Sequence, residues 1–216
     1  MTSSEAGLRA RFDTREEPFE HGEWRASILL PRAADALIDE AEFADAERLP
    51  YWADLWPSAR ALARHLLDAP PAAPAALELG SGVALPSLAL RRLGTDAVAT
   101  DWYMDALRFA SVNSERNGLG PLRTLLLDWR DPPENEPYPL VVAADVLYEM
   151  RNAELLAALL PRVVAPGGRA LMADPGRVYL PEFRNRMYAL GWRTAEIDRR
   201  DEDRSTIRIW EVHPPG

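Results

Sequence analysis

The chain has 216 residues, 47% of them hydrophobic, and a net charge of −9, so it is most simply one globular domain with a substantial core. It contains no cysteine, which excludes disulfides, thiolate nucleophiles and thiolate metal sites. Its acidic balance argues against a protein whose main task is to hold nucleic acid, and it mildly favours a basic partner such as a lysine side chain.

The sequence shows no sign of a membrane or metal protein. No apolar run approaches the roughly 18–20 residues that cross a bilayer, and the polar residues 1–15 lack the apolar core of a signal peptide. We therefore expect a cytoplasmic protein without membrane contact. His21, His65 and His213 are far apart and show no metal-ligand spacing, so we expect no metal site. Lysine is absent, and arginine supplies the other basic side chains.

Residues 1–48 are predicted to form an N-terminal extension and residues 49–216 the main domain, together in a single compact unit. The extension contains a predicted strand at 24–30 and a predicted helix at 33–43. Pro57 suits the first turn of a helix that runs to about residue 67. The proline-rich residues 69–74 predict a short connector.

From residue 75 the pattern alternates between strands and helices. Strands are predicted at 75–79, 97–100, 122–127, 140–144 and 170–173, and helices at 85–93, 104–117, 152–164 (ending at 166–168) and 181–190. Residues 193–197 and 206–212 alternate in polarity and flank a turn-like 201–203, which indicates an antiparallel pair. The pattern predicts an α/β, Rossmann-like, doubly wound seven-stranded sheet, mostly parallel with a C-terminal antiparallel hairpin.

A glycine loop follows the first strand of this sheet. Glu78 is the next-to-last residue of the strand, and the loop Gly80-Ser81-Gly82 follows the strand directly. Glycines allow the backbone to approach a ligand closely, and the following helix offers free N–H groups. A dinucleotide site requires G-x-G-x-x-G, but Leu85 occupies the third glycine position. The loop therefore suits a cofactor without a pyrophosphate.

Acids also end the next two strands. Asp101 comes about 20 residues after the loop, where an acid accepts hydrogen bonds from ribose hydroxyls; it can alternatively cap the next helix. Trp102 fits either an adenine face or the core. Asp128 and Trp129 fit a second adenine contact, or a turn that leads into a proline pair.

The fourth strand ends at Asp145, three residues before Tyr148. Residues beyond the carboxyl ends of parallel strands line the ligand crevice. Asp145 can orient an attacking amine there, and Tyr148 can bond that amine or contact a cation; the alternative is a helix cap and a half-buried tyrosine. Asp174-Pro175-Gly176-Arg177 reads as a turn or as a loop that presents Arg177 to a substrate.

The order of these motifs resembles the class I, seven-β-strand methyltransferases that depend on S-adenosylmethionine (SAM). The motifs are Glu78-Leu79-Gly80-Ser81-Gly82, Ala99-Thr100-Asp101, Leu127-Asp128-Trp129 and Asp145-Val146-Leu147-Tyr148. The last motif, with Leu55-Trp56-Pro57-Ser58-Ala59, is similar to the protein-lysine methyltransferase branch (methyltransferase family 16). Pro50-Tyr51-Trp52-Ala53 and Asp174-Pro175-Gly176-Arg177 are similar to its electron-transfer flavoprotein β-subunit lysine methyltransferases.

The resemblance implies a SAM-dependent N-methyltransferase that methylates lysine in a protein by direct in-line transfer, leaving S-adenosyl-L-homocysteine. It implies that Glu78, Gly80, Ser81 and Gly82 belong to the loop that passes the methionine part. The other implied roles are Asp101 at the ribose, Trp102, Asp128 and Trp129 at the adenine, Trp56 closing the pocket, and Asp145 and Tyr148 holding the amine, with Asp145 also at the cofactor. The implied partner is a protein with an exposed lysine, with the electron-transfer flavoprotein β subunit as a candidate.

Three alternatives stay open. They are a small-molecule, nicotinamide-like N-methyltransferase, an RNA methyltransferase, and a SAM-binding module without activity. The chain also departs from the family at Ala84, where many members have a third glycine. A methyl group there is expected to narrow the methionine pocket slightly.

Overall fold

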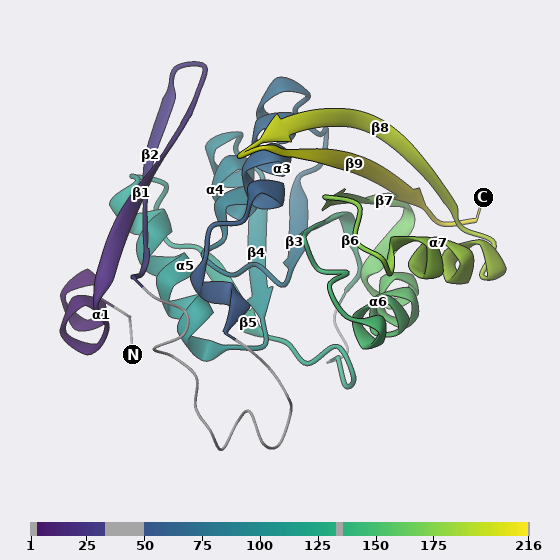
Figure 1. Ribbon diagram of the computed structural model, residues 1–216, viewed down its shortest axis with the longest axis horizontal. Helices are drawn as coiled ribbons and strands as arrows, with labels where there is room; N and C mark the ends of the chain where they lie inside the picture. Colours follow the sequence, from purple (N-terminus) through teal and green to yellow (C-terminus); the bar gives the residue numbers. More distant parts are fainter. Residues whose placement is uncertain (1–3, 33–49, 133–135, 216) are drawn as a thin grey trace.

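The computed structural model describes residues 4–32, 50–132 and 136–215. The helix predicted at 33–43 lies outside these residues. The main sheet has seven strands in the order β5-β4-β3-β6-β7-β9-β8 (Figure 1). Its strands are β3 (Ala75–Leu79), β4 (Asp96–Asp101), β5 (Arg123–Leu126), β6 (Tyr138–Ala144), β7 (Val164–Asp174), β8 (Arg193–Glu202) and β9 (Ser205–His213).

The connections confirm the predicted doubly wound sheet. β3 pairs in parallel with both β4 and β6, and the parallel pairing continues to β5 on one side and β7 on the other. β9 runs antiparallel to its two neighbours, β7 and β8. Strand order therefore reverses between β3 and β6, and in open α/β sheets ligands bind outside the carboxyl ends of the strands at such a point.

Helices cover both faces of the sheet (Figure 1). α3 (Pro57–Asp68), α4 (Leu85–Arg92) and α5 (Met104–Arg116) pack on one face, and α6 (Met150–Val163) and α7 (Leu180–Ala189) on the other. Side chains of β3 alternate between the two cores: Ala76 joins the first, whereas Leu77 and Leu79 join the second. This period of two is why the apolar strands could be recognised in the sequence. No described helix has the length and apolarity to cross a membrane.

β7 differs from its prediction at its start. The helix end predicted at 166–168 and the strand start at 170 are both wrong, because β7 already begins at Val164. The pairing of β6 with β7 shifts register between Tyr138 and Leu140. A Cβ on Gly168 would lie 2.9 Å from the Pro139 carbonyl oxygen. The glycine therefore marks a close backbone approach inside a bulged strand, not a helix stop.

The C-terminal hairpin is longer than predicted. Asp201 and Glu202 belong to β8, and the turn consists of Asp203 and Arg204, both with positive φ (45° and 67°). A two-residue turn of this kind matches the twist of the flanking strands. The acidic cluster looked like a turn, but it lies largely within an exposed edge strand.

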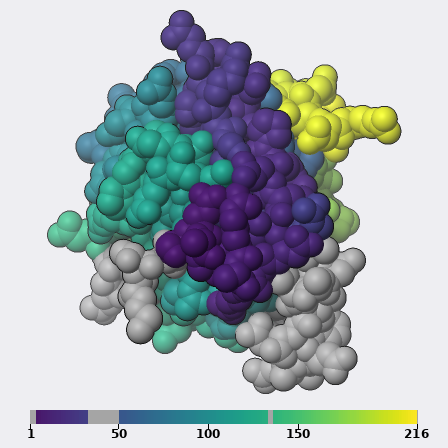
Figure 2. Space-filling model, turned by 90° about the vertical axis from the view of Figure 1, so that its left-hand side faces the viewer, coloured from purple at the N-terminus to yellow at the C-terminus, as the bar shows by residue number. Residues whose placement is uncertain are grey.

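The N-terminal residues form α1 (Glu5–Arg11) and a two-stranded antiparallel sheet of β1 (Thr14–His21) and β2 (Trp24–Pro31). The prediction of β2 is confirmed, whereas α1 and β1 were not predicted. In β1 only Phe19 is buried, so no alternating apolar pattern marks it. Figure 2 shows α1 and this hairpin lying over α5 on the outside of the molecule.

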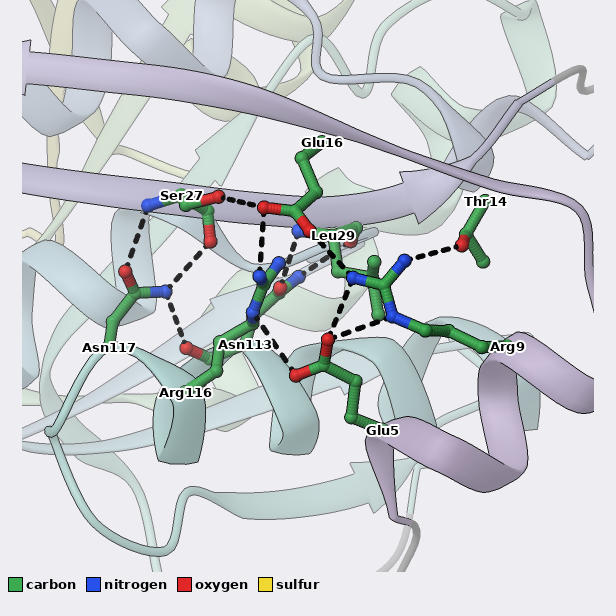
Figure 3. Close-up of polar contacts among 9 residues, drawn as sticks. All are labelled: Glu5, Arg9, Thr14, Glu16, Ser27, Leu29, Asn113, Arg116 and Asn117. Atoms are coloured by element: carbon green, nitrogen blue, oxygen red, sulfur yellow. Dashed lines mark hydrogen bonds and ion pairs between the residues drawn. The ribbon is translucent and has the colours of Figure 1, made fainter.

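Two asparagines of α5 fasten the hairpin (Figure 3). Asn113 accepts from the Leu29 N–H at 2.8 Å and donates to the Leu29 carbonyl at 3.0 Å. Asn117 does the same with Ser27, at 2.9 and 3.0 Å. Residues four apart on a helix and two apart on a strand are both about 6–7 Å apart. The two side-chain amides therefore pair with the backbone N–H and carbonyl groups on the outer edge of β2, as a neighbouring strand would.

Candidate active site

A pocket opens at the carboxyl ends of β3, β4 and β6, with a volume of about 1080 Å³ including its open mouth. The segment before α3, which contains the 3₁₀ turn η2 (Tyr51–Ala53), forms the opposite wall. Ten residues singled out in the sequence line it: Trp56, Glu78, Gly80, Ser81, Gly82, Asp101, Trp102, Trp129, Asp145 and Tyr148. The pocket therefore lies where the reversal of strand order places a ligand crevice.

The two glycines of the loop are required by backbone geometry. Gly80 and Gly82 have φ of 63° and 51°, and a Cβ on Gly82 would lie 3.1 Å from the Trp52 carbonyl oxygen. A Cβ on Gly80 would lie 3.1 Å from a Val146 methyl carbon. Side chains at these positions would meet both strain and a wall of the pocket. The loop thus allows a ligand to approach main-chain atoms.

Ala84 does not act as expected. Its side chain is fully buried and it is not among the residues that line the pocket, so the expectation that its methyl narrows the pocket does not hold. The consequence lies in the backbone, since Ala84 has φ 66°. A left-handed conformation costs a non-glycine residue about 1–2 kcal/mol.

Glu78 is a buried acid in the pocket wall. Its Oε2 accepts from the Ser87 N–H at 2.9 Å, in the first turn of α4. Burial raises the pKa of Glu78 to about 8, and the nearby charge of Asp101 adds to the effect. The carboxyl is therefore protonated at neutral pH while it links β3 to α4.

Asp101 holds two backbone groups at once. Its Oδ2 accepts from the Gly82 N–H and its Oδ1 from the Tyr103 N–H, both at 2.9 Å. The carboxylate thereby joins the glycine loop to the start of α5. Asp101 is not the N-cap of α5, because that position is Tyr103; the carboxylate holds the N-cap residue's own N–H while it lines the pocket wall. A carboxylate has about four acceptor positions, so both uses are compatible.

Asp128 and Trp129, which follow β5 in the sequence, lie in different environments. Trp129 lines the pocket, and its ring lies 3.5 Å from where a Gly80 Cβ would be. Asp128 is not among the lining residues; its carboxylate accepts from the backbone N–H and the guanidinium of Arg130. The same guanidinium lies 4.8 Å from the ring centre of Trp102. Arg130 therefore bridges these residues, a contact that the sequence did not reveal.

Asp145 lies in a strained and nearly buried position at the end of β6. Its φ is 57°, and its N–H donates to the Ala173 carbonyl of β7 at 2.9 Å. The side chain is 6% exposed. Its Oδ1 accepts from Arg177 Nε at 2.7 Å and its Oδ2 from Ser58 Oγ at 3.3 Å. Strain of this kind, held by surrounding bonds, is typical of functional residues.

The aromatic rings of Tyr51, Trp56 and Tyr148 line the same pocket as Asp145. The rings of Tyr51 and Tyr148 lie 5.1 Å apart, and those of Tyr51 and Trp56 lie 6.0 Å apart. Trp56 donates its Nε1–H to the Tyr51 carbonyl at 2.7 Å. A carboxylate beside aromatic faces attracts a cation or an amine. Tyr51 was not chosen as a site residue from the sequence, although its aromatic neighbours drew attention to that segment.

The turn after β7 brings Arg177 to the site. Asp174 Oδ1 accepts from the N–H groups of Gly176 and Arg177, at 2.7 and 2.8 Å. Asp174 is 1% exposed, and burial raises its pKa to about 6. The turn is therefore hydrogen-bonded locally, as one of the two alternatives from the sequence had it, and it directs the Arg177 side chain to Asp145.

Comparison with known proteins identifies relatives of this arrangement. Residues 51–180, which include the segment from Trp56 to Arg177, match the family described as lysine methyltransferase. The mouse electron transfer flavoprotein beta subunit lysine methyltransferase is 31% identical over 176 residues, which cover 76% of this chain and 68% of that protein. The ribosomal protein L11 methyltransferase of Thermus thermophilus is 36% identical over 140 residues, covering 63% of this chain and 51% of that protein.

Solved structures share the fold at lower identity. The T. thermophilus 16S rRNA N2 G1207 methyltransferase, in complex with SAM and guanosine, has a TM-score of 0.59 at 21% identity and covers 94% of this chain and 45% of its own. Magnesium protoporphyrin IX methyltransferase of Synechocystis, with bound SAM, has a TM-score of 0.57 at 17% identity, covering 73% and 77%. At this identity the likeness extends to the fold alone.

Proposed function

The chain belongs to the lysine methyltransferase family and is a SAM-dependent methyltransferase, and we propose that it transfers the methyl group to lysine side chains of a protein. The observation that carries the proposal is the position of Asp145 at the pocket edge, with Tyr51, Trp56 and Tyr148 beside it. This surrounding suits an amine that must be held and aimed.

The pocket fits the cofactor. Its loop has no room for Cβ atoms at Gly80 and Gly82, and it does not depend on a third glycine to hold a pyrophosphate. When bound, SAM supplies an electrophilic methyl group on a sulfonium. Asp101 would accept hydrogen bonds from the ribose hydroxyls while it continues to hold Gly82. Trp102 and Trp129 offer ring faces for the adenine. Asp128, which lies beside the pocket and not in its lining, would contact the adenine from there.

The residues around Asp145 would prepare the amine for direct in-line attack. The carboxylate accepts a hydrogen bond from the neutral amine and so directs its lone pair toward the pocket. The Tyr148 hydroxyl is a second partner, and Trp56 and Tyr51 exclude water. Positioning of this kind contributes several kcal/mol, since reactants held in a near-attack geometry avoid an entropic cost. No covalent enzyme intermediate is needed.

The candidate substrate follows from the relatives' names. The mouse and rat relatives, which are 31% and 30% identical to this chain, are named for the electron transfer flavoprotein beta subunit. We extend that acceptor to this chain as a candidate. The net charge of −9 agrees with an acceptor whose modified side chain is basic.

The experiment uses SAM labelled in its methyl group, the purified protein and a lysate of its own host. The products are separated into protein, nucleic-acid and small-molecule fractions, with Asp145→Asn as the control. Label in protein that disappears with the control supports the proposal. Label only among small molecules points to a small-molecule N-methyltransferase, and label only in RNA to an RNA methyltransferase. Tight SAM binding with no label in any fraction points to a binding module.

A further inference from the structure

Arg177 forms an ion pair with Asp145, the carboxylate proposed above to hold the substrate amine. Its Nε donates to Asp145 Oδ1 at 2.7 Å, and its guanidinium lies 5.9 Å from the ring centre of Trp56. It comes from the turn after β7 and is not among the residues that line the cofactor pocket. A cation therefore already lies between the Asp145 carboxylate and the Trp56 ring.

We propose that Arg177 is a resident stand-in for the substrate lysine: its guanidinium holds the acceptor position on Asp145 and swings out when a lysine side chain enters. The inference rests on the proposed function, because it assigns the position of the acceptor amine. It makes Arg177 a specificity-determining residue, since an incoming group must replace its bond to Asp145.

The geometry of the Arg177–Asp145 ion pair would allow a substrate amine to replace Arg177. Strong arginine–carboxylate pairs use two parallel N–H bonds, but here Nε alone donates to Asp145. Across the described residues neither Nη atom of Arg177 makes a hydrogen bond. The Arg177 side chain is 36% exposed, compared with 6% for Asp145. The arginine can therefore leave toward solvent while the carboxylate stays in place.

The turn that carries Arg177 would not have to move. Asp174 fixes the backbone N–H groups of Gly176 and Arg177, so exchange requires only rotation of the arginine side chain. Val178, the next residue, is 78% exposed, which leaves open space beside the turn. The anchored backbone returns the guanidinium to the same carboxylate after product leaves.

The exchange also explains why Asp145 can be kept nearly buried. A buried carboxylate without a partner is strongly destabilising, and between turnovers no substrate amine would pair with Asp145. Arg177 supplies the positive charge in the substrate-free state. A substrate amine must offer a hydrogen-bond donor of its own to take over, so an apolar or donor-free side chain is rejected.

The chain offers an unusually direct test, because it contains no lysine. Arg177→Lys would place the sole lysine side chain on the residue that reaches Asp145. Its amine nitrogen lies one bond beyond the position of the arginine Nε along the side chain. The variant should become its own substrate. A bond forms between the amine nitrogen and the methyl carbon, the carbon–sulfur bond breaks with its electron pair left on sulfur, and the amine's proton passes to water.

The first experiment incubates Arg177→Lys with SAM and locates methyl groups by mass spectrometry of peptides. Two variants are matched controls. Arg151→Lys puts a lysine elsewhere in the pocket wall, beside Glu149, and Arg184→Lys puts one near the ring of Trp210, on α7. We expect methylation at residue 177 only, at a first-order rate independent of protein concentration. Equal methylation of the controls, or a rate that rises with protein concentration, would overturn the inference.

The second experiment does not depend on methyl transfer. Calorimetry measures binding of n-butylammonium, which mimics the end of a lysine side chain, in the presence of S-adenosylhomocysteine. Removing the resident cation in Arg177→Met should tighten binding at least about tenfold, the effect of a bond worth 1.4 kcal/mol. Asp145→Asn in that background should abolish the gain. Unchanged or weaker binding would mean that Arg177 merely positions Asp145, and the inference would fail.

The two proposals fail in different ways. If the wild-type protein forms methyl-lysine in host proteins but Arg177→Lys acquires no methyl group, the stand-in role is wrong and the proposed function survives. If n-butylammonium binding tightens in Arg177→Met but no methyl-lysine forms in any host protein, the cation site stands and the proposed function is wrong.

Discussion

The N–H of Gly82 donates to the carboxylate of Asp101 at 2.9 Å, across 19 positions of sequence. This bond joins the ends of two neighbouring parallel strands, β3 and β4. It holds the glycine loop open in a conformation with positive φ at Gly82. The residue expected to bind the ribose therefore also shapes the loop that admits the methionine part of the cofactor.

Asp101→Ala should weaken SAM binding by about 10- to 100-fold. Hydrogen bonds to charged groups contribute about 1.5–3 kcal/mol, and the variant removes both the loop contact and the ribose acceptor. Calorimetric titration with SAM measures the change. Asp105→Ala, which alters a half-buried carboxylate outside the pocket lining that pairs with Arg11 and Arg108, is the control and should bind normally. Unchanged affinity in Asp101→Ala would contradict the ribose assignment.

Asp145→Asn should leave SAM affinity within about threefold and reduce methyl transfer by about 100-fold or more, the range for loss of a positioned catalytic group. Asparagine tolerates the left-handed backbone of this position, so the protein should stay folded. Asp145→Ala should have the same effect on transfer with added backbone strain. Binding and turnover are measured on the same preparation. Loss of SAM binding by a folded variant would show that the carboxylate serves the cofactor and not the amine.

Two glycine substitutions separate strain from contact. Gly82→Ala meets a positive φ of 51° and the Trp52 carbonyl oxygen at 3.1 Å, whereas Gly22→Ala has φ 54° with nothing within 4 Å. Both should lose about 1–2 kcal/mol of stability from the backbone. Only Gly82→Ala should also lose SAM affinity, because the loop must shift away from Trp52. Thermal unfolding and SAM titration of both variants test this, and equal SAM binding would disprove the close-approach argument.

The protonation of Glu78 predicts a fall in stability as pH rises from 4.5 to about 8. Its pKa is about 8 in the folded protein and 4.5 ordinarily, so the folded state holds one more proton between these values. This contribution of Glu78 to stability is therefore fully present below pH 4.5 and is lost as pH rises through about 8. Glu78→Gln should flatten the dependence between pH 6.5 and 8.5, a window above the pKa of about 6 of Asp174. Denaturant unfolding at several pH values measures it; an equal slope in the variant would contradict the prediction.

The proton held by Glu78 also predicts that SAM binding is coupled to proton release. SAM carries positive charge, and a cation near a carboxyl favours its ionised form. Binding near pH 7.5 should therefore release a proton from Glu78. Titrations in buffers of different ionisation enthalpy would detect it, and Glu78→Gln should remove it.

Asn113→Ala should destabilise the protein by about 2–4 kcal/mol. The variant leaves both backbone groups of the buried Leu29 without their partners, and each unsatisfied buried group costs about 1–3 kcal/mol. Ser111→Ala on the same helix, whose hydroxyl bonds only to the preceding turn, is the control and should be nearly neutral. Chemical denaturation compares the two variants. A loss below about 1 kcal/mol would show that the hairpin is held by other contacts.

The main sheet was accessible from sequence because its rules are local. Buried strands such as β3 and β6 are apolar runs followed by polar or glycine-rich turns, and α4 and α5 have helical periodicity. The start of β7 was not accessible, because Pro166 and Gly167 read as a helix stop, while the bulge depends on a register shift against β6. β1 was not accessible because its charged residues pair across space with α1, α3 and α5, as in Arg116–Glu16 (Figure 3).

In the candidate site, too, some features follow from local sequence rules and others do not. Residues directly after strands, such as Asp101 and Asp145, follow from the rule that the carboxyl ends of parallel strands meet at one edge. Contacts that depend on side-chain reach do not follow from it. The sequence did not indicate that Arg130 would hold Asp128, or that Arg177 would pair with Asp145. The role of Ala84 was also misjudged, because its positive φ is a property of the folded loop.

The most direct test of the central claim follows the methyl group to its acceptor atom. Host protein that is labelled from methyl-labelled SAM is hydrolysed to amino acids, and the labelled amino acid is identified by chromatography and mass spectrometry. The proposed function predicts methyl-lysine, formed by the wild-type protein and not by Asp145→Asn. Label in another amino acid, or methyl-lysine formed equally by the variant, would contradict it.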